Sequence, residues 1–342
     1  MKPKILKVYE KSEMRKFSIP NFWGCKTIEE EKEQIDIGEF QLITQLQGWK
    51  FGVIRGNGVL IGEKDKIVAL NKDATEVLKS LTNGKKINLE EKSIKEFMSE
   101  VKTQVGISLL ELDVKVFYDD VARYPQSDLC CPQEYLREDT SHIPDEALTN
   151  RYGCGSPLGT AVPRAGEVIV DLGSGSGVDC FVAAKKVGPT GRTIGIDFSD
   201  EMLKIAYNYN KKVAENLGYD IVEFHKGKIY YMPLPDETAD IIISNCVINL
   251  CDDNVQVFKE IYRVLKAGGR FAIADIVSER ELEDELKKDT ELRAKCFGHN
   301  TLEDYMKGIK ITGFQRITVE KLSYWKKEKG HDFYSVTLKG YK

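Results

Sequence analysis

Three observations predict an α/β fold for most of this 342-residue chain. Strand-like and helix-like segments alternate from about residue 165 to the end, which is typical of a parallel sheet with helices on both faces. The glycine-rich run DLGSGSG (171–177) joins a strand-like run to a helix-like one. Two strand-like runs then follow each other directly at the end of the chain, at 314–325 and 333–342. We therefore predict a Rossmann-like, doubly wound sheet with an antiparallel edge hairpin, and a smaller α+β, winged-helix-like domain before it.

Short apolar runs mark the strands of the larger domain, 165–342, and amphipathic patterns mark its helices. One helix is expected between Ser199, an N-cap residue, and Gly218, a stop. Another begins near Asn254 and is expected to stop at Gly268 and Gly269. The strands alternate with these helices and are predicted at 167–173, 193–197, 221–227, 239–246 and 269–277.

The first half of the chain divides by pattern into an irregular arm (1–39), a small domain (40–115) and a connector (116–164). In the small domain, residues 58–70 read as a hairpin, and two amphipathic helices are expected, from Asn71 to Gly84 and up to Gly106. This combination indicates the winged-helix-like arrangement. The piece IVALNKDATEVLKSLTNGKK (67–86) resembles PqqD-like peptide-recognition domains, which implies a peptide partner. A cap that covers the substrate without binding any peptide is the alternative.

Composition narrows the class of protein. Hydrophobic residues make up 42% and charged residues 30%, as in an ordinary globular protein, and the net charge of −4 argues against nucleic acid as a partner. No apolar run approaches the roughly 18 residues that span a membrane, and the charged N-terminus lacks the apolar core of a signal peptide. We therefore expect a cytoplasmic protein without a membrane contact, whose eight cysteines are mostly reduced thiols.

The glycine loop predicts a nucleoside-type ligand. Gly173, Gly175 and Gly177 permit a tight strand-to-helix turn that brings bare backbone against a ligand. Asp197 follows about 20 residues on, at the tip of the second strand, where a ribose would be held. Either a dinucleotide or S-adenosylmethionine fits this pattern, and a plain glycine turn is the simplest alternative. Asp171 favours S-adenosylmethionine, because a carboxylate attracts a cationic group and repels a pyrophosphate.

Four strings carry a family resemblance: DLGSGSG, GIDFSDEML, SNCVINL and RVLKAGGRFAIADI. Together they resemble the class I S-adenosylmethionine-dependent methyltransferases. With YGCGSP, the segment SDLCCP and the late Cys296, the chain more closely resembles arsenite methyltransferases, and its ending FYSVTLKGYK is similar to a bacterial branch linked to arsenosugar synthesis. The resemblance implies an enzyme that uses S-adenosylmethionine to methylate a small-molecule substrate.

The resemblance also implies a cofactor site around the glycine loop. The loop backbone would face the methionine and ribose parts, Asp171 would lie under the amino-acid end and Asp197 would accept both ribose hydroxyls. Phe198 and Met202 would flank the adenine, although both residue types also pack in ordinary cores. The implied cofactor residues are Asp171, Gly173, Ser174, Gly175, Gly177, Asp197, Phe198, Met202, Ile229 and Asn245.

Cysteines carry the implied substrate chemistry. In the family, thiolates at the positions of Cys154, Cys246 and Cys296 bind trivalent arsenic, a soft centre that suits soft ligands. Cys130 or Cys131 matches a fourth cysteine, which pairs with the YGCG cysteine as the product oxidises, so a thiol reductant is an expected partner. The alternative for each of the three is simple packing, since cysteine is often buried.

His299 departs from the family pattern, which has small residues after the late cysteine. It is a candidate general base, because its ordinary pKa lies near 6.5, or a further metalloid ligand. It could instead cap the helix that starts near Thr301. A base would be needed for a protonated nucleophile, so the substrate stays open between arsenite, another small thiol or selenol, and a peptide delivered by the N-terminal domain.

Overall fold

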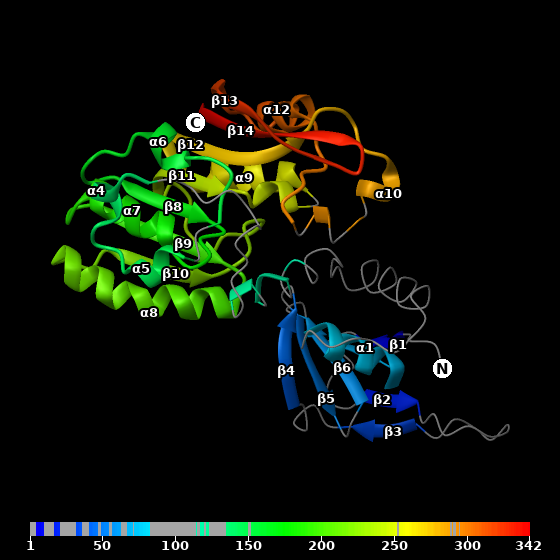
Figure 1. Ribbon diagram of the computed structural model, residues 1–342. Helices are drawn as coiled ribbons and strands as arrows, with labels where there is room; N and C mark the ends of the chain where they lie inside the picture. The colour runs from blue at the N-terminus through cyan, green and yellow to red at the C-terminus, as the bar shows by residue number, and fades with distance from the viewer. Residues whose placement is uncertain are drawn as a thin grey trace. The chain divides into compact units, whose positions relative to one another are not determined.

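The computed structural model divides the chain into two compact units, Met1–Val116 and Phe117–Lys342. In the second unit it describes residues 117–119, 121–122, 135–149 and 152–342, apart from positions 252, 288, 290, 291 and 294. In the first unit it describes only seven strands, one helix and residue 114. Figure 1 shows the elements of both units.

A seven-stranded sheet forms the centre of the second unit, in the order β10-β9-β8-β11-β12-β14-β13. The first five strands in this order are parallel, and β14 is antiparallel to both of its neighbours. The predicted doubly wound sheet and its antiparallel edge hairpin are therefore confirmed. The strands are β8 (Val168–Leu172), β9 (Arg192–Asp197), β10 (Val222–Lys226), β11 (Ala239–Asn245), β12 (Leu265–Ser278), β13 (Gln315–Glu328) and β14 (His331–Tyr341).

Helices pack on both faces of this sheet, because successive strand residues point to opposite sides. Ile169 and Ile241 face one apolar cluster, which is completed by α6, α7 and α8. Val170 and Ile242 face the other, which is completed by α9 and α12 (Figure 1). The helices are α4 (Arg137–Thr140), α5 (Asp145–Leu148), α6 (Pro157–Ala161), α7 (Val178–Val187), α8 (Asp200–Leu217), the 3-10 helix η3 (Ile248–Leu250), α9 (Asn254–Val264), α10 (Asp284–Lys287) and α12 (Leu302–Lys310).

The helix caps follow the sequence signals in one case and depart from them in another. The Ser199 hydroxyl accepts the Met202 N–H at the start of α8, and Gly218 ends this helix in a left-handed conformation. However, α9 ends at Val264, before the predicted stop at Gly268. The reason is tertiary, because Leu265 already pairs with β11 as the first residue of β12.

The described part of the first unit is a five-stranded antiparallel sheet, in the order β1-β7-β6-β5-β4, with helix α1 and a separate β2–β3 pair. The predicted hairpin is present as β6–β7, but it lies inside the sheet and its strands are not edges. The elements are β1 (Ile5–Tyr9), β2 (Phe17–Pro20), β3 (Lys32–Ile35), β4 (Gln41–Leu46), β5 (Trp49–Ile54), β6 (Asn57–Gly62), β7 (Ile67–Leu70) and α1 (Lys72–Thr82).

The arm predicted to be irregular, 1–39, instead contains β1, β2 and β3, because β1 finds a pairing partner in β7, about 60 residues away. The predicted second helix, up to Gly106, lies outside the described residues. The winged-helix-like arrangement and the peptide partner therefore stay predictions.

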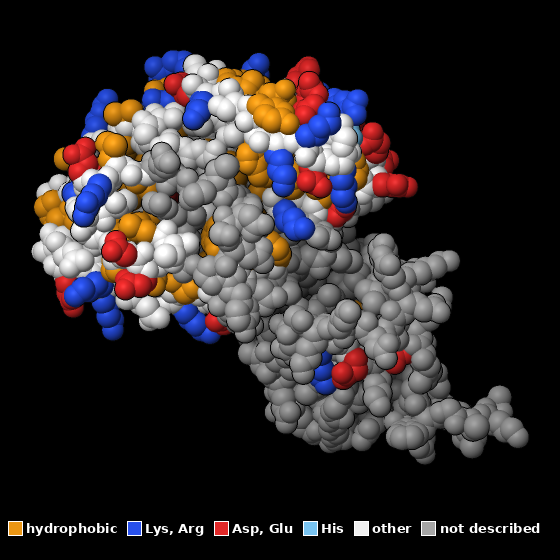
Figure 2. All heavy atoms as spheres, in the orientation of Figure 1, with side chains coloured by type: hydrophobic (Ala, Val, Ile, Leu, Met, Phe, Trp, Pro, Cys, Tyr) orange, Lys and Arg blue, Asp and Glu red, His pale blue; other side chains and the backbone are white. Residues whose placement is uncertain are grey.

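The surface of the second unit matches the balanced composition. On the face in Figure 2, basic and acidic side chains are interspersed, with apolar side chains between them. None of the helices in the described part of the chain is long and apolar enough to cross a membrane.

Candidate functional site

The glycine loop folds tightly between β8 and α7. A Cβ at Gly173 would lie 2.4 Å from a methyl group of Val247, and one at Gly177 would lie 2.6 Å from the Phe224 ring. All three loop glycines have positive φ, which favours glycine. At Gly175, by contrast, a Cβ would meet nothing within 4 Å, so the middle of the loop faces open space. Ser174 is buried, and its hydroxyl points toward β9, 2.7 Å from the place of a Cβ at Gly195.

Asp197 holds the loop in place and faces the same region. Its carboxylate accepts the Gly175 N–H at 2.8 Å and the Ser199 N–H at 2.8 Å. Burial raises the pKa of Asp197 to about 6, against the lowering effect of these backbone donors. The Ser199 hydroxyl in turn donates to Asp119 at 2.6 Å. A buried carboxylate beside the open centre of the loop is suited to accept ribose hydroxyls.

The two predicted adenine neighbours differ in environment. Phe198 is half-buried, whereas Met202 is buried against Val121 and the rings of Tyr118 and Tyr152. Ile229 is also buried, in the core cluster on the α9 face of the sheet. Contacts of Phe198, Met202 and Ile229 with a cofactor stay predictions.

A second, half-buried acid, which sequence reasoning missed, lies beside Asp171. Asp179, in the first turn of α7, accepts the Tyr135 hydroxyl and lies 3.5 Å from the Asn245 amide. Burial, together with the neighbouring Asp179 carboxylate, raises the pKa of Asp171 well above its ordinary value. The buried thiol of Cys180 donates to Asp171 at 3.4 Å. Asp171 and Asp179 together give the loop an acidic side that suits a cationic group.

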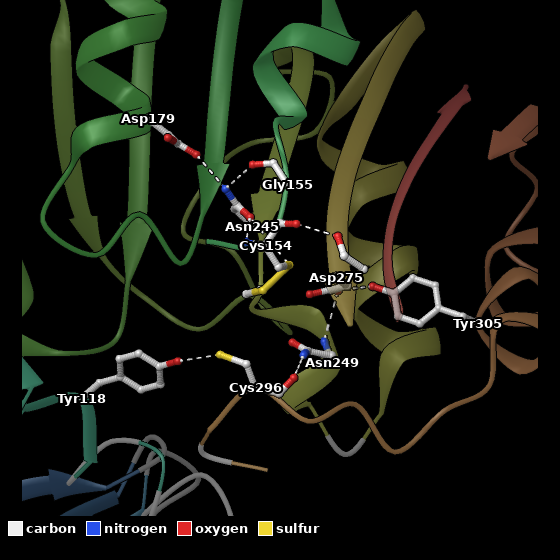
Figure 3. Close-up of a disulfide and its surroundings, with 11 residues drawn as sticks. Tyr118, Cys154, Gly155, Asp179, Asn245, Asn249, Asp275, Cys296 and Tyr305 are labelled. Carbon is white, nitrogen blue, oxygen red and sulfur yellow. Dashed lines mark hydrogen bonds between the residues drawn. A yellow bond between two sulfur atoms is a disulfide. The ribbon is translucent and has the colours of Figure 1, made fainter. Parts of the chain in front are cut away.

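Asn245 ties the YGCG loop to the end of β11 (Figure 3). Its side-chain oxygen accepts the Cys154 N–H at 2.9 Å, and its amide donates to the Gly155 carbonyl at 3.2 Å. Glycines flank Cys154 because the loop presses on the sheet: a Cβ at Gly153 would lie 2.5 Å from the Asn245 amide. Asn245 therefore positions Cys154, in addition to its predicted place in the cofactor site.

The three predicted arsenic ligands come together in one apolar cluster. Cys246 and Cys296 are buried within it and Cys154 packs against it, with Phe297 and Phe333 among its members. The sulfur atoms of Cys154 and Cys246 form a disulfide, 92 residues apart in the sequence. Cys296 is not part of this disulfide, and its thiol lies 3.3 Å from the Tyr118 hydroxyl (Figure 3). The expectation of reduced thiols therefore fails for one pair, whose partners lie close enough to bond.

In the disulfide state the three sulfurs do not form an open ligand set. Accordingly, no group of three or more His, Cys, Asp or Glu side chains in the described ranges is arranged to hold a metal ion. Cys130 and Cys131 lie outside the described residues. His299 is half-buried three residues after Cys296, and Thr301 rather than His299 caps α12. Its role as a base or ligand stays a prediction.

A further buried polar group supports the cysteine cluster and was also missed. The Asn249 amide donates to the Cys296 carbonyl at 2.8 Å, and the Asn249 N–H donates to Asp275 at 3.2 Å. Asp275 also accepts the hydroxyl of Tyr305. No local sequence pattern links these three positions, although Asn249 stands in SNCVINL, the same string as Cys246.

Known proteins share this architecture. A methyltransferase domain family matches residues 163–331. The chain is 38% identical over 202 residues to an arsenite methyltransferase of Halobacterium salinarum, covering 56% of this chain and 50% of that protein. Against the human arsenite methyltransferase it is 33% identical over 202 residues, covering 55% and 53%. The chain thus spans about half the length of the curated relatives it matches.

A solved structure extends the likeness to three dimensions. It is CrArsM, an arsenic(III) S-adenosylmethionine methyltransferase from Chlamydomonas reinhardtii, with a TM-score of 0.55 and 30% identity. The match covers 60% of this chain and 73% of that one. Because the glycine loop, the strand order and the SNC strand end all lie within this unit, we conclude that the chain belongs to the S-adenosylmethionine-dependent methyltransferases and that arsenite methyltransferases are among its relatives.

Proposed function

We propose that this protein transfers a methyl group from S-adenosylmethionine to trivalent arsenic held by the thiolates of Cys154, Cys246 and Cys296. The gathering of these three cysteines carries the proposal. They are far apart in the sequence yet share one apolar cluster. This cluster adjoins the glycine loop, because Val247, the residue after Cys246, packs on Gly173.

The cofactor side of the site fits this role. When bound, S-adenosylmethionine would supply the sulfonium methyl group. The open space at Gly175 leaves room along the loop, and the Asp197 carboxylate lies beside it to accept ribose hydroxyls. Burial raises the pKa of both Asp171 and Asp179, and a cationic amino-acid group bound beside them would favour their ionised, negatively charged form. The relatives named as S-adenosylmethionine or arsenite methyltransferases support this assignment.

Thiolates suit a soft, thiophilic centre. Arsenous acid and three thiols condense to an arsenic trithiolate with release of three water molecules, and the arsenic keeps its lone pair. That lone pair can attack a methyl group in line without loss of a proton, so this substrate needs no general base. The apolar surroundings of Cys246 and Cys296 would limit the access of water to the reacting atoms.

The disulfide sets a condition on this activity. While the Cys154 and Cys246 sulfurs are bonded to each other, neither can bind arsenic. Two equivalents of a small thiol would reduce the bond, yielding two protein thiols and one small-molecule disulfide. We therefore expect methyl transfer to require a thiol reductant, in agreement with the partner predicted from the sequence.

The direct test is turnover of S-adenosylmethionine by the full-length protein with arsenite, in the presence and absence of glutathione. We expect S-adenosylhomocysteine and methylated arsenic to form only when arsenite and glutathione are both present. Cys246→Ser should abolish this turnover and leave S-adenosylmethionine binding intact. Cys251→Ala is the matched control, since Cys251 is a buried cysteine five residues further on that belongs neither to the disulfide nor to the proposed trio.

The same assay distinguishes arsenite from the other candidate methyl acceptors. Turnover with a small thiol or selenol but not with arsenite would overturn the arsenic assignment and retain the methyltransferase. A failure to bind arsenite by the reduced wild-type protein, with S-adenosylmethionine binding intact, would have the same meaning.

A further inference from the structure

We propose that Asn249 is a positioning residue that holds Cys296 in the conformation needed for binding the substrate, with the Asp275–Tyr305 pair as its support. The role of Cys296 as a substrate ligand rests on the function proposed above. The role of Asn249 in holding the Cys296 segment can be tested independently of that function.

Asn249 connects the two cysteine-bearing segments. It stands three residues after Cys246, in η3, and is fully buried. Its amide donates to the Cys296 carbonyl at 2.8 Å, across 47 positions of sequence. Figure 3 shows Asn249 between Cys296 and Asp275. One side chain thus joins the segment of the second cysteine to the segment of the third.

The Cys296 backbone needs such a contact, because it is in an unfavourable conformation. Its φ is 68°, in the left-handed region that non-glycine residues seldom adopt. Residues held there persist when surrounding contacts over-determine them, and they gather at functional sites. Two such contacts at the Cys296 backbone are the Arg293 carbonyl, which accepts the Cys296 N–H at 2.9 Å, and the Asn249 amide, which donates to the Cys296 carbonyl. Asn249 is therefore one of the groups that fix this conformation.

The support behind Asn249 is rigid and buried. The Asn249 N–H donates to the Asp275 carboxyl at 3.2 Å, and the same carboxyl oxygen accepts the Tyr305 hydroxyl. Asp275 is on β12, in the middle of the sheet, and Tyr305 is on α12. Both side chains are almost completely inaccessible to solvent. A strand and a helix therefore define where Asn249, and through it Cys296, can lie.

The contacts of Asn249 affect the geometry of the three cysteine ligands. Three thiolates bind one arsenic centre only when their sulfurs are at matching distances, and Cys296 is the member of the trio on a long segment between β12 and α12. A looser Cys296 should weaken substrate binding more than cofactor binding, because the loop glycines and Asp197 do not depend on this contact.

The first test measures the accessibility of the Cys296 thiol in the reduced, ligand-free protein. The rate of alkylation by iodoacetamide is followed by mass spectrometry in wild type, Asn249→Ala and Asn249→Ser. We expect about a tenfold faster reaction at Cys296 in both variants, the effect of one lost buried hydrogen bond. Cys180, a buried free thiol in the same unit, is the internal control and should keep its wild-type rate.

Asn216→Ala is the matched variant, because Asn216 also donates its amide to one backbone carbonyl, that of His142, at 2.9 Å. It should leave the Cys296 rate unchanged. An unchanged Cys296 rate in the two Asn249 variants would overturn the proposal. An equal acceleration at Cys180, or loss of the folded state in both variants, would also overturn it, since Asn249 would then serve the fold at large.

The second test separates substrate from cofactor. In Asn249→Ala the dissociation constant for arsenite should rise about tenfold, while that for S-adenosylmethionine stays within about twofold of wild type. Equal weakening of both would contradict a positioning role. If the wild-type protein binds no arsenite, the proposed function fails, and the alkylation rates still decide whether Asn249 holds Cys296.

Discussion

Asp275 provides a quantitative test of how this site is built, through the substitution Asp275→Asn. The carboxyl is fully buried, and burial raises its pKa from the ordinary 3.8 to about 7, in spite of the hydrogen bonds from Tyr305 and Asn249. Two donors to this carboxyl, the Asn249 N–H and the Tyr305 hydroxyl, meet at one oxygen, Oδ2. An asparagine oxygen in the same place can accept both, so the substitution removes the titrating charge and keeps these two bonds.

The sign and size of the contribution of Asp275 to stability follow from the linkage between proton binding and folding. The folded protein binds the Asp275 proton more tightly than the unfolded chain does, so stability is greatest below the unfolded pKa of 3.8 and is lost as the pH rises to about 7. The difference of about three pH units corresponds to about 4 kcal/mol at 1.36 kcal/mol per unit. About 2.5 kcal/mol of this falls between pH 5 and pH 8, because the remainder is lost below pH 5.

Urea unfolding of both proteins, repeated from pH 5 to pH 8, measures this contribution. The Asp275→Asn protein should gain stability relative to wild type by about 2.5 kcal/mol across this interval. Other titrating groups cancel in the comparison, and the new amide adds only a constant offset. A difference in free energy of unfolding that does not change with pH would refute the reasoning, since it would mean that Asp275 titrates alike in the folded and unfolded states.

Three further predictions concern the cofactor loop and the cysteines. S-adenosylmethionine should bind more weakly as the pH falls below about 6, the pKa of Asp197, and Asp197→Asn should remove this dependence in calorimetric titrations. Gly155→Ala should destabilise the protein by about 1–3 kcal/mol, because its Cβ would lie 2.5 Å from a β12 side chain. Gly308→Ala in α12 should not destabilise it, because no atom lies closer than 3.7 Å to the new Cβ. Thermal unfolding of the two variants measures the difference. In Cys154→Ser, the cross-linked peptide of residues 154 and 246 should disappear from non-reducing mass spectra, and Cys246 should become alkylated; persistence of a Cys246 disulfide would show another partner.

Local signals were enough to predict the sheet, the glycine loop and the main caps. Ser199 and Gly218 delimit α8 as expected, because capping depends on residues within one turn of the helix end. Gly173 and Gly177 adopt the positive φ that the loop pattern implied. These features are determined by neighbours in sequence, so they could be predicted without the fold.

Contacts between distant segments were not predictable in this way. The end of α9 at Val264 depends on strand pairing with β11. Asp179 became a site residue only through its position next to Asp171 and Asn245. The Cys154–Cys246 bond also differs from the pairing that the family resemblance implied, and nothing in the spacing of the cysteines distinguishes the two. Such choices depend on which loops the sheet brings together.

The backbone at Cys246 bears on whether these cysteines are more than packing residues. Successive side chains of a strand point to opposite faces, yet Asn245 and Cys246 both reach the Cys154 loop. They can do so because Cys246 leaves the strand with a φ of 58°, while its N–H still donates to β12. A left-handed conformation costs a non-glycine residue about 1 kcal/mol or more, and glycine would avoid it. Cys296 bears the same cost, and the proposed need to direct two sulfurs toward a common centre would account for thiols at both positions.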